Sequence, residues 1–389
     1  MNVLFLTHSF PRNDGDAAGS FVLRLARALV AEDVTVRVVA PGASGLDAHA
    51  ALSGVQVDRF RYAPRKYETL AYGGNMAAQV RDSFSAKVTL VGFLGAEFRA
   101  GLSARREFHP DVIHAHWWFP NGVAATWVAR MAGLPLVTTL HGTDVRMARN
   151  IPSSRPVFRH VLKHSSAVTA VSRWLVQETQ SIVSVPPPIV APMPVSAELF
   201  DATTSGPRSR RLLFVGRLMP QKGIDLLLGA LVQLPADVGL DVVGDGPDRA
   251  AMESLASSLG VGDRVRWHGA VKQHALPPMY QRALALVVPS AEEGLGLVAV
   301  EAQLSETPVV AFDSGGLPDV IQHDRTGVLV RERSVDALAG ALKALLARDD
   351  SGRSLGAAGR LHALATFAPE SVARRYADIY RAVIGRGAP

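Results

Sequence analysis

The chain has 389 residues, of which 48% are hydrophobic, and it carries a formal net charge of +6 at pH 7. This length exceeds what one hydrophobic core usually serves, so two domains are expected. The lack of cysteine excludes a disulfide framework and a thiolate metal site, and no apolar run approaches the ~18 residues of a membrane span.

The positive charge is concentrated in the first half of the chain. Residues 1–189 carry 20 Lys and Arg against 13 Asp and Glu, whereas the remainder carries 21 against 22. Such a surplus is typical of proteins that meet an anionic membrane, an anionic substrate or nucleic acid. The sequence has no zinc-finger pattern and no aromatic-rich RNA-binding motif, so no nucleic-acid partner is expected.

Short apolar runs alternate with helical patterns through the first half. The N-terminus leads directly into an apolar run without the basic segment of a signal peptide, which favours the first buried strand of a cytoplasmic protein. Strands are predicted at residues 3–7, 34–40, 112–115, 136–140 and 167–171, and helices at 21–31 and 123–132. This rhythm predicts a parallel sheet covered by helices on both faces.

A proline-dense stretch at residues 183–195 precedes the second half and predicts a stiff connector, because proline fixes φ and lacks an amide donor. Beyond it, strands are predicted at 211–215, 240–243, 265–268, 285–288 and 309–312, and helices at 225–234, 247–259, after Gly296, at 335–347 and at 369–384. We therefore expect an α/β protein with two doubly wound, Rossmann-like domains facing a cleft. The expected bounds are 1–190 and 191–368, with a C-terminal helix in 369–389.

Two carboxylates, Glu293 and Glu301, lie eight residues apart across a glycine turn. The amides of Gly294, Leu295 and Gly296 open a helix, where free N–H groups and the positive end of the helix dipole attract an anion. Glu301 can accept from both hydroxyls of a ribose, and Glu293 would lie nearer a reacting sugar. The alternative is that Glu293 caps the helix and that Glu301 is a solvated helical position.

Two cations, Arg217 and Lys222, flank the turn after the strand predicted at 211–215. This turn belongs to the carboxyl edge of the sheet, where α/β proteins bind ligands. Two fixed cations suit a diphosphate leaving group, because negative charge grows on its bridging oxygen as the bond to a sugar breaks. Two solvated loop cations are the alternative.

His141 follows the strand predicted at 136–140, and Asp144 is a predicted helix N-cap. His141 would thus project from the carboxyl edge of the sheet into the cleft, unless it is tied into loop hydrogen bonds. His114 and His116 share one face of a strand without a nearby carboxylate and are interpreted as cleft lining with a structural or acceptor-side role.

Asp14 and Asp16 form a D-x-D pattern in the loop before Gly19. Paired aspartates can bind a divalent metal, but a glycine-containing loop before a first helix favours backbone contacts. No metal site is therefore predicted.

Together these motifs resemble the retaining glycosyltransferases of family 4, the glycosyl transferases group 1. They occur in that family's order over nearly the whole chain: His141-Gly142, Gly216-Arg217 with Lys222-Gly223, Gly244-Asp-Gly-Pro247, Ser290 to Glu301, and Gly315-Gly-Leu-Pro318. The resemblance implies the GT-B fold, with the nucleotide-sugar donor on the C-terminal domain, the acceptor on the N-terminal domain, and the last helix crossing back onto the N-terminal domain.

The resemblance also implies residue roles. The catalytic residues would be His141, which approaches the donor sugar, and Glu293. The donor-binding residues would be those matching the family's diphosphate, ribose and sugar contacts, namely Gly19, Arg217, Lys222, Gly294, Leu295, Gly296 and Glu301. The sequence departs from the family pattern at Asp16-Ala17, where a double glycine is usual, and at residues 193–196, where Asn-Gly-Val-Asp is usual.

The reaction implied is transfer of a hexose from a UDP- or GDP-linked sugar to a glycan, lipid-linked or small-molecule acceptor, in cell-envelope polysaccharide biosynthesis. The family needs no metal or further cofactor, and it retains anomeric configuration by a front-face displacement in which the leaving phosphate activates the acceptor. The alternatives are a GT-B sugar-nucleotide epimerase or phosphorylase, and a non-catalytic GT-B binding protein. A nicotinamide dehydrogenase is disfavoured, because no Gly-x-Gly-x-x-Gly follows the first strand.

The basic first half also favours peripheral contact with an anionic membrane, at the inner face of the plasma membrane, and a lipid-linked acceptor. Residues 146–164 contain five cations and no acidic residue. A helix starting near Pro156 would carry Arg159 and Lys163 on one side and apolar residues on another. A second basic group, Arg59, Arg61, Arg65 and Lys66, precedes the mixed segment that leads to Phe98, another place where a helix could rest on lipid headgroups. The alternative is a core-packed helix with a solvated basic face.

Overall fold

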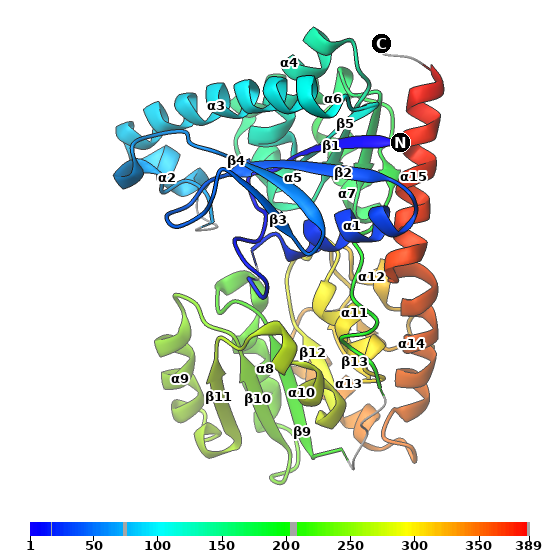
Figure 1. The fold of residues 1–389 in the computed structure, drawn as a ribbon. Helices are drawn as coiled ribbons and strands as arrows, with labels where there is room; N and C mark the ends of the chain where they lie inside the picture. Colours follow the sequence, from blue (N-terminus) through cyan, green and yellow to red (C-terminus); the bar gives the residue numbers. More distant parts are fainter. Residues whose placement is uncertain (17, 73–75, 203–207, 387–389) are drawn as a thin grey trace. The chain divides into compact units, whose positions relative to one another are not determined.

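The computed structural model describes residues 1–16, 18–72, 76–202 and 208–386. The chain divides into two compact α/β units (Figure 1). The first consists of Met1–Pro194 and Pro369–Pro389, and the second of Val195–Ala368. The division thus falls after Pro194 instead of after residue 190, and the C-terminal helix belongs to the first unit.

The first unit is built on an eight-stranded sheet in the order β3-β4-β2-β1-β5-β6-β7-β8, which is parallel except for β3. Its strands are β1 Asn2–Leu6, β2 Thr35–Pro41, β3 His49–Leu52, β4 Val55–Phe60, β5 Val112–His116, β6 Leu136–Leu140, β7 Ala167–Ala170 and β8 Ile189–Val190. The sequence does not predict β3 or β4, because β3 is an exposed edge strand and β4 mixes buried with exposed positions. The central strands β5 and β6 are buried at every position, although β5 contains two histidines and β6 contains two threonines among their apolar residues.

The proline-dense stretch is only partly a connector. Ile189–Val190 pairs in parallel with β7 as the last strand of the first sheet, and prolines are tolerated at such an edge. The amide of Ala191 still donates to the carbonyl of Ala170, whereas Val195 donates to Phe367 of the second unit. These bonds explain why the boundary lies between Pro194 and Val195.

Helices cover both faces of the first sheet. They are α1 Ser20–Ala31, α2 Met76–Asp82, α3 Phe84–Phe108, α4 Val123–Ala132, α5 Thr143–Asn150, α6 Arg155–Lys163, α7 Arg173–Ile182 and α15 Pro369–Arg386. Three short helical turns, η1 Arg65–Tyr67, η2 Trp118–Gly122 and η3 Pro152–Ser154, complete the unit. Among the described residues, no helix is both long and apolar enough to cross a bilayer.

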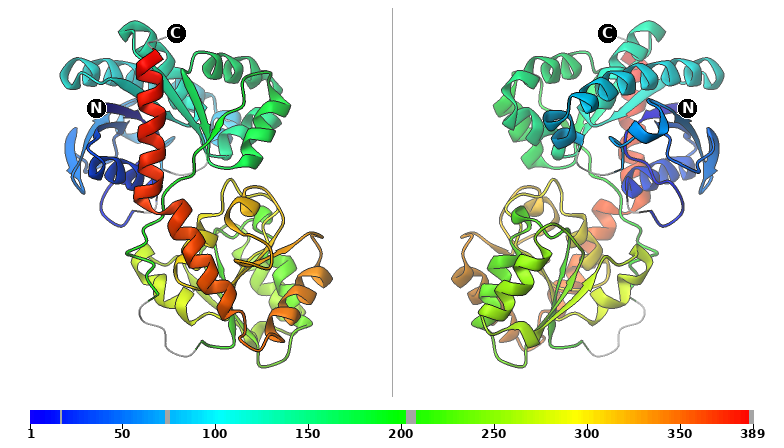
Figure 2. Two further views of the ribbon diagram at one scale, coloured as in Figure 1. Left: turned by 90° about the vertical axis from the view of Figure 1, so that its right-hand side faces the viewer. Right: turned by 90° about the vertical axis from the view of Figure 1, so that its left-hand side faces the viewer.

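Helix α15 packs beside α1, which is far from it in sequence (Figure 2). Buried polar side chains join α15 to the first sheet. His114 on β5 makes a 2.7 Å hydrogen bond to the Tyr380 hydroxyl through Nδ1 and another of 2.7 Å to Thr139 Oγ1 through Nε2. Tyr376 donates to the carbonyl of Ala191 over 3.1 Å. His114 therefore has a structural role, which was one of the two roles expected for it. It does not line a cleft, because its ring is fully buried and both of its nitrogens are bonded.

The second unit contains a six-stranded parallel sheet in the order β11-β10-β9-β12-β13-β14. Its strands are β9 Arg211–Val215, β10 Gly239–Val243, β11 Val265–Gly269, β12 Ala285–Val288, β13 Val309–Phe312 and β14 Val328–Val330. Its helices are α8 Ile224–Val232, α9 Arg249–Ser258, α10 Pro277–Arg282, α11 Leu297–Leu304, α12 Leu317–Val320, α13 Val335–Leu346 and α14 Arg353–Phe367, with short turns η4 Pro220–Lys222, η5 Gly262–Arg264 and η6 Gln273–Ala275. The prediction of two doubly wound α/β domains is confirmed.

Candidate functional site

The loops after β9 and β12 bring together residues of two separate sequence motifs in the second unit. The chain runs from β9 outward to β10 and β11 and then returns to β12 on the other side of β9. Ligands of open α/β sheets collect at the carboxyl ends of the strands beside such a reversal. The loop after β9 carries Arg217 and Lys222, and the loop after β12 carries Glu293.

Lys222 and Glu293 form an ion pair at this point. Lys222 Nζ lies 2.5 Å from Glu293 Oε1, and the Ser290 hydroxyl donates to the same oxygen over 2.7 Å. The two charged side chains are only 26% and 13% exposed, so water screens the pair less than it would at an open surface. Glu293 does not cap α11, whose N-cap is Gly296 without a side-chain hydrogen bond. The capping alternative is thus wrong, and the carboxylate is held by a lysine.

Two glycines allow the loops to approach one another this closely. Gly223 has φ +65°, and a Cβ there would lie 2.1 Å from the carbonyl oxygen of Pro289. Gly315 has φ +57°, and a Cβ there would lie 2.3 Å from the carbonyl oxygen of Glu293. That same oxygen accepts from the amide of Gly316 over 2.8 Å. The Gly315-Gly316 pair therefore holds the backbone of the turn that presents Glu293.

Glu301 lies on α11 and is buried, with 6% of its surface exposed. Its Oε2 accepts from the Tyr280 hydroxyl over 2.9 Å, and its Oε1 accepts from Gln273 Nε2 over 3.4 Å. Burial, followed by the Glu301 charge, raises the pKa of Tyr280 well above its usual value, so this hydroxyl stays a donor. The alternative of a solvated glutamate is wrong. Sequence reasoning missed Tyr280 and Gln273, which lie before β12 and are brought to Glu301 only by the fold.

Among the described residues of this unit, the other candidates do not take part in the side-chain contacts of Lys222, Glu293 and Glu301. Arg217 is exposed and has no ion-pair partner within the described residues. Gly294 is partly exposed, Leu295 is buried, and Gly296 has φ +90° at the start of α11. Their roles, including that of Arg217, remain predictions.

A group of aromatic rings gathers at the carboxyl end of the first sheet. β1, β5 and β6 are neighbours, and His8, His116 and His141 lie at or just after their ends. His116 Nδ1 is 3.2 Å from His141 Nε2, and the His141 ring lies 4.3 Å from that of Trp117 between centroids. His116 thus contacts a predicted site residue, unlike His114. The sequence feature that marked His116 as a candidate was its spacing of two residues from His114, which places both side chains on one face of the strand.

These imidazoles are neutral at neutral pH. Burial, reinforced by the neighbouring imidazoles, lowers the pKa of His141 and of His116 well below the usual value. Burial also lowers the pKa of His8 to about 4, partly offset by its hydrogen bond with Asn121. A neutral ring has one N–H donor and one acceptor nitrogen, which suits contact with the hydroxyl of a sugar.

Asp144 fixes the backbone that carries His141. Helix α5 begins at Thr143 with Gly142 as N-cap, so the prediction of Asp144 as N-cap is wrong. Its Oδ1 instead accepts from the amides of His141 and Gly142, at 3.1 and 2.9 Å, from inside the first turn. Burial raises its pKa to about 6 despite these bonds, because desolvation of the carboxylate outweighs them.

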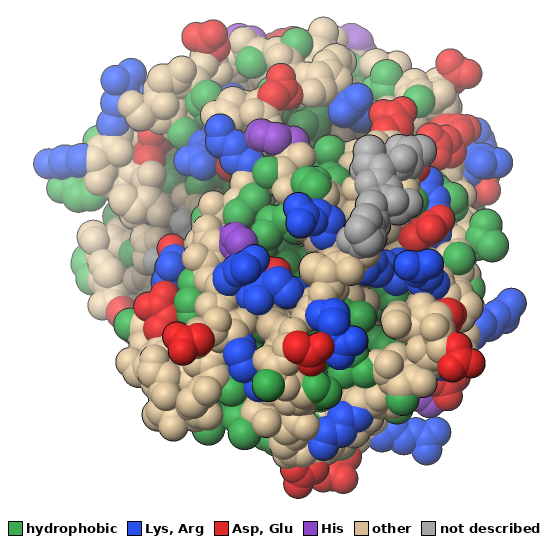
Figure 3. All heavy atoms as spheres, turned by 90° about the horizontal axis from the view of Figure 1, so that it is seen from below, with side chains coloured by type: hydrophobic (Ala, Val, Ile, Leu, Met, Phe, Trp, Pro, Cys, Tyr) green, Lys and Arg blue, Asp and Glu red, His purple; other side chains and the backbone are tan. Residues whose placement is uncertain are grey.

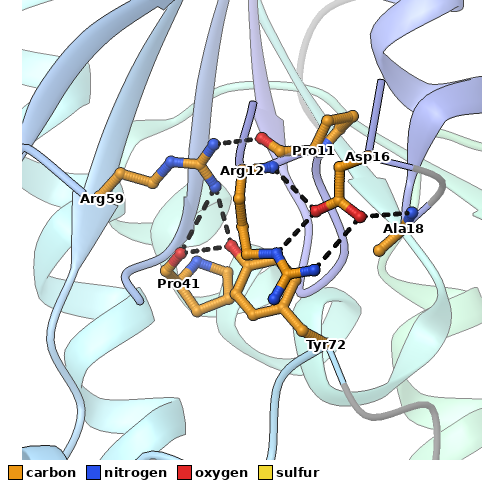
Figure 4. A network of polar contacts seen from close by, with 7 residues as sticks. All are labelled: Pro11, Arg12, Asp16, Ala18, Pro41, Arg59 and Tyr72. Atoms are coloured by element: carbon orange, nitrogen blue, oxygen red, sulfur yellow. Dashed lines mark hydrogen bonds and ion pairs between the residues drawn. The ribbon is translucent and has the colours of Figure 1, made fainter. Parts of the chain in front are cut away.

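The loop that precedes α1 is organised by an ion pair. Asp16 accepts from Arg12 Nε over 2.6 Å, and Arg12 lies over the ring of Tyr72 (Figure 4). Asp14 points elsewhere and accepts from the Ser53 hydroxyl over 2.9 Å. Gly19 is the N-cap of α1 with φ +70°, and Ala17, which with Asp16 replaces the usual double glycine, lies outside the described residues. Within the described ranges, no three His, Asp or Glu side chains are grouped to hold a metal.

Comparison with known proteins gives the context for these residues. Residues 18–198 match the family described as Glycosyltransferase Family 4, and residues 196–362 match Glycosyl transferases group 1. A D-inositol 3-phosphate glycosyltransferase of Xylanimonas cellulosilytica is 35% identical over 316 residues, which cover 73% of this chain and 75% of that protein. A GDP-mannose-dependent alpha-(1-6)-phosphatidylinositol monomannoside mannosyltransferase of Mycobacterium tuberculosis is 33% identical over 276 residues, covering 65% and 71% respectively.

The fold has counterparts among solved structures. A sucrose-phosphate synthase from Thermosynechococcus elongatus superposes with a TM-score of 0.81 at 24% identity, covering 99% of this chain and all of that chain. Anabaena HepE in complex with UDP-glucose has a TM-score of 0.74 at 19% identity, covering 98% of this chain and all of that chain. These likenesses show the GT-B fold. The chain belongs to glycosyltransferase family 4 of the glycosyl transferases group 1, and it is a glycosyltransferase.

Proposed function

We propose that this enzyme transfers a hexose from a UDP- or GDP-linked sugar to a glycan, lipid-linked or small-molecule acceptor, with retention of configuration and without a metal. The observation that supports this most is the Lys222–Glu293 ion pair beside the strand reversal of the second sheet. A relative whose name specifies GDP-mannose and a neighbour bound to UDP-glucose support a nucleotide-sugar donor.

In the proposed reaction each group has a separate task. Lys222 and Arg217 stabilise the negative charge that develops on the departing diphosphate. Glu301, oriented by Tyr280, accepts hydrogen bonds from the ribose, while Glu293 and neutral His141 bind the sugar being transferred. The acceptor hydroxyl loses its proton to the leaving phosphate as its oxygen bonds to the anomeric carbon on the face that the phosphate leaves.

The direct test is a screen of purified protein with several nucleotide sugars and acceptors. Mass spectrometry would detect the released nucleotide diphosphate and the product, and NMR would give the anomeric configuration of the new bond. Each reaction would be run with and without a chelator. Inversion, or activity that a chelator abolishes and a divalent ion restores, would contradict retention or metal independence. Acceptor-free, phosphate-dependent turnover would favour a phosphorylase.

Replacing Glu301 by alanine should weaken nucleotide binding by about 1 to 3 kcal/mol, the cost of losing hydrogen bonds to a charged group. Titration calorimetry with UDP and GDP would measure the change. Glu332→Ala, which removes an exposed carboxylate of the same unit, is the matched control. Equal affinities in wild type and Glu301→Ala would remove the ribose assignment.

A lipid-linked acceptor is the second part of the proposal, but the basic helix α6 is not its best support. Its apolar residues Phe158, Val161 and Leu162 are buried in the first unit, so α6 is a core-packed helix with a solvated basic face. The basic group at residues 59–66 is also a weaker candidate for lipid contact than its sequence indicates. Arg59 is buried and donates to the Tyr72 hydroxyl over 2.8 Å (Figure 4).

Helix α3 offers the better surface for contact with lipid. Phe84, Val88 and Val91 are 80%, 57% and 71% exposed and recur at spacings of four and three residues, which places them on one side of the helix. Lys87 lies within the same turns. An exposed apolar stripe with a nearby cation suits the interface of an anionic leaflet.

Vesicle co-sedimentation would test this surface. Wild type should bind vesicles containing anionic lipid more than neutral ones, and added salt should weaken binding because each nearby cation contributes about 1 kcal/mol. The variant Phe84→Ser/Val91→Ser should lose binding. Leu361→Ser, which removes a 72% exposed leucine from the second unit, is the control. Equal, salt-insensitive partitioning of all three proteins would favour a soluble acceptor.

A further inference from the structure

One face of the second sheet carries a charged cavity over β9, β10 and β11. Successive side chains of a strand point to opposite faces. On β9 and β10, Leu212, Phe214, Leu240 and Val242 pack into the apolar core, whereas Arg211 and its neighbours on the other face line a cavity of about 330 Å³. The C-terminal end of helix α10 borders the cavity through Arg282.

The charged side chains that line the cavity carry more positive than negative charge. Its single carboxylate, Asp241, is already shared: Arg211 Nε lies 2.9 Å from Oδ2, and His268 Nε2 lies 2.9 Å from Oδ1. Arg266 and Arg282 also line the cavity, are exposed, and have no ion-pair partner within the described part of the chain. Three guanidinium groups therefore face one carboxylate, which leaves two positive charges uncompensated. Viewed from the side on which these strands begin, Lys and Arg side chains gather around the middle of the surface, with a histidine among them (Figure 3).

Arg211 is held rigidly, which distinguishes this group from mobile surface cations. Besides its pair with Asp241, it donates through Nη2 to the carbonyl of Leu240 over 2.7 Å. The lining also includes the apolar side chains of Leu213 and Met279. The cavity thus combines a preformed polar wall, two free guanidinium groups and an apolar part.

We infer that this cavity is a second binding site, which takes an oxyanion carried on a molecule the size of a monosaccharide. Guanidinium groups recognise phosphate and carboxylate through paired N–H donors, and the volume is at the lower end of small-molecule sites. The inference goes beyond the proposed transfer reaction. Arg211 begins β9, whereas Lys222 follows the other end of that strand, so the two sites share no residue.

Equilibrium dialysis of the protein would test the inference. The ligands are inorganic phosphate, glucose 6-phosphate, glucuronate and glucose. In the variant Arg266→Gln/Arg282→Gln, the anion should bind this site at least tenfold more weakly than in the wild type, as measured by the Kd. Arg210→Gln is the matched control, because Arg210 is an exposed arginine that pairs with Asp237 over 2.6 Å and does not line the cavity. Both substitutions affect exposed side chains, so the melting temperatures should stay the same.

The outcomes separate the ligand sources. Loss of glucose 6-phosphate binding in the double variant supports a phosphate ester, and loss of glucuronate binding supports a carboxylate. Identical anion binding in the wild type and both variants, or equally tight binding of neutral glucose, would overturn the inference. The double variant keeps Lys222, Glu293 and Glu301, so its sugar-transfer activity tests the proposed function separately from the cavity.

Discussion

Lys222→Ala should lower the turnover number on the order of 100-fold while leaving the fold intact, because stabilising charge on a leaving group typically has an effect of that size. The ammonium group lies at the strand reversal of the second sheet, 2.5 Å from Glu293. Ser290 still donates to the Glu293 carboxylate after the substitution, so that group keeps a partner. Arg217→Ala should show a similar loss with less effect on the loop, since Arg217 is exposed.

Steady-state kinetics with the donor found in the screen would measure the effect, and thermal unfolding would report on the fold. Lys343→Ala, on the exposed side of α13, is the control for removing a positive charge. Unchanged kinetics in both Lys222→Ala and Arg217→Ala would remove the diphosphate assignment. A fall in melting temperature that matches the fall in rate would instead assign Lys222 a structural role.

Glu97→Met should stabilise the protein by about 1 to 3 kcal/mol at neutral pH, the range expected for removing buried polar atoms without hydrogen bonds. Glu97 lies on α3 and is fully buried, and within the described residues neither of its carboxylate oxygens has a hydrogen-bond partner. Burial raises its pKa well above the usual value, so the folded protein keeps this carboxyl protonated where the unfolded chain ionises it. Chemical denaturation would measure the difference in the free energy of unfolding.

The pH dependence gives an independent measure of the same group. Between the unfolded pKa near 4.5 and the raised folded pKa, the folded state binds one more proton than the unfolded state, so stability falls as pH rises. The slope attributable to Glu97 is about −1.4 kcal/mol per pH unit in that window. Glu97→Gln, which cannot ionise, should remove this slope, whereas Glu107→Gln on the exposed part of α3 should keep it. If the free energy of unfolding varies with pH in the same way for the wild type and Glu97→Gln, burial does not keep the Glu97 carboxyl protonated.

The repeating elements of both sheets follow from local sequence. The bounds predicted for β6, β9, β12, β13 and α4 agree with the structure. Strands buried on both faces are rich in apolar residues, and such apolar segments are visible in the sequence without knowledge of their neighbours. Among the helices that were not predicted are α7 and α14. In α14, Gly356 and Gly359 lower the helix propensity, and packing against α11 overrides that preference.

What the sequence determined by itself is the family, the two-domain α/β organisation and the order of the motifs, because these depend on residues close together in the chain. Only the tertiary structure decided which side chains meet. Lys222 reaches Glu293 across a separation of 71 residues, and His114 reaches Tyr380 across 266. The same strand carries His114 and His116 two residues apart, yet one fastens α15 and the other touches His141. Spacing along a strand specifies the face of a side chain, and the helix or loop packed against that face determines its partner.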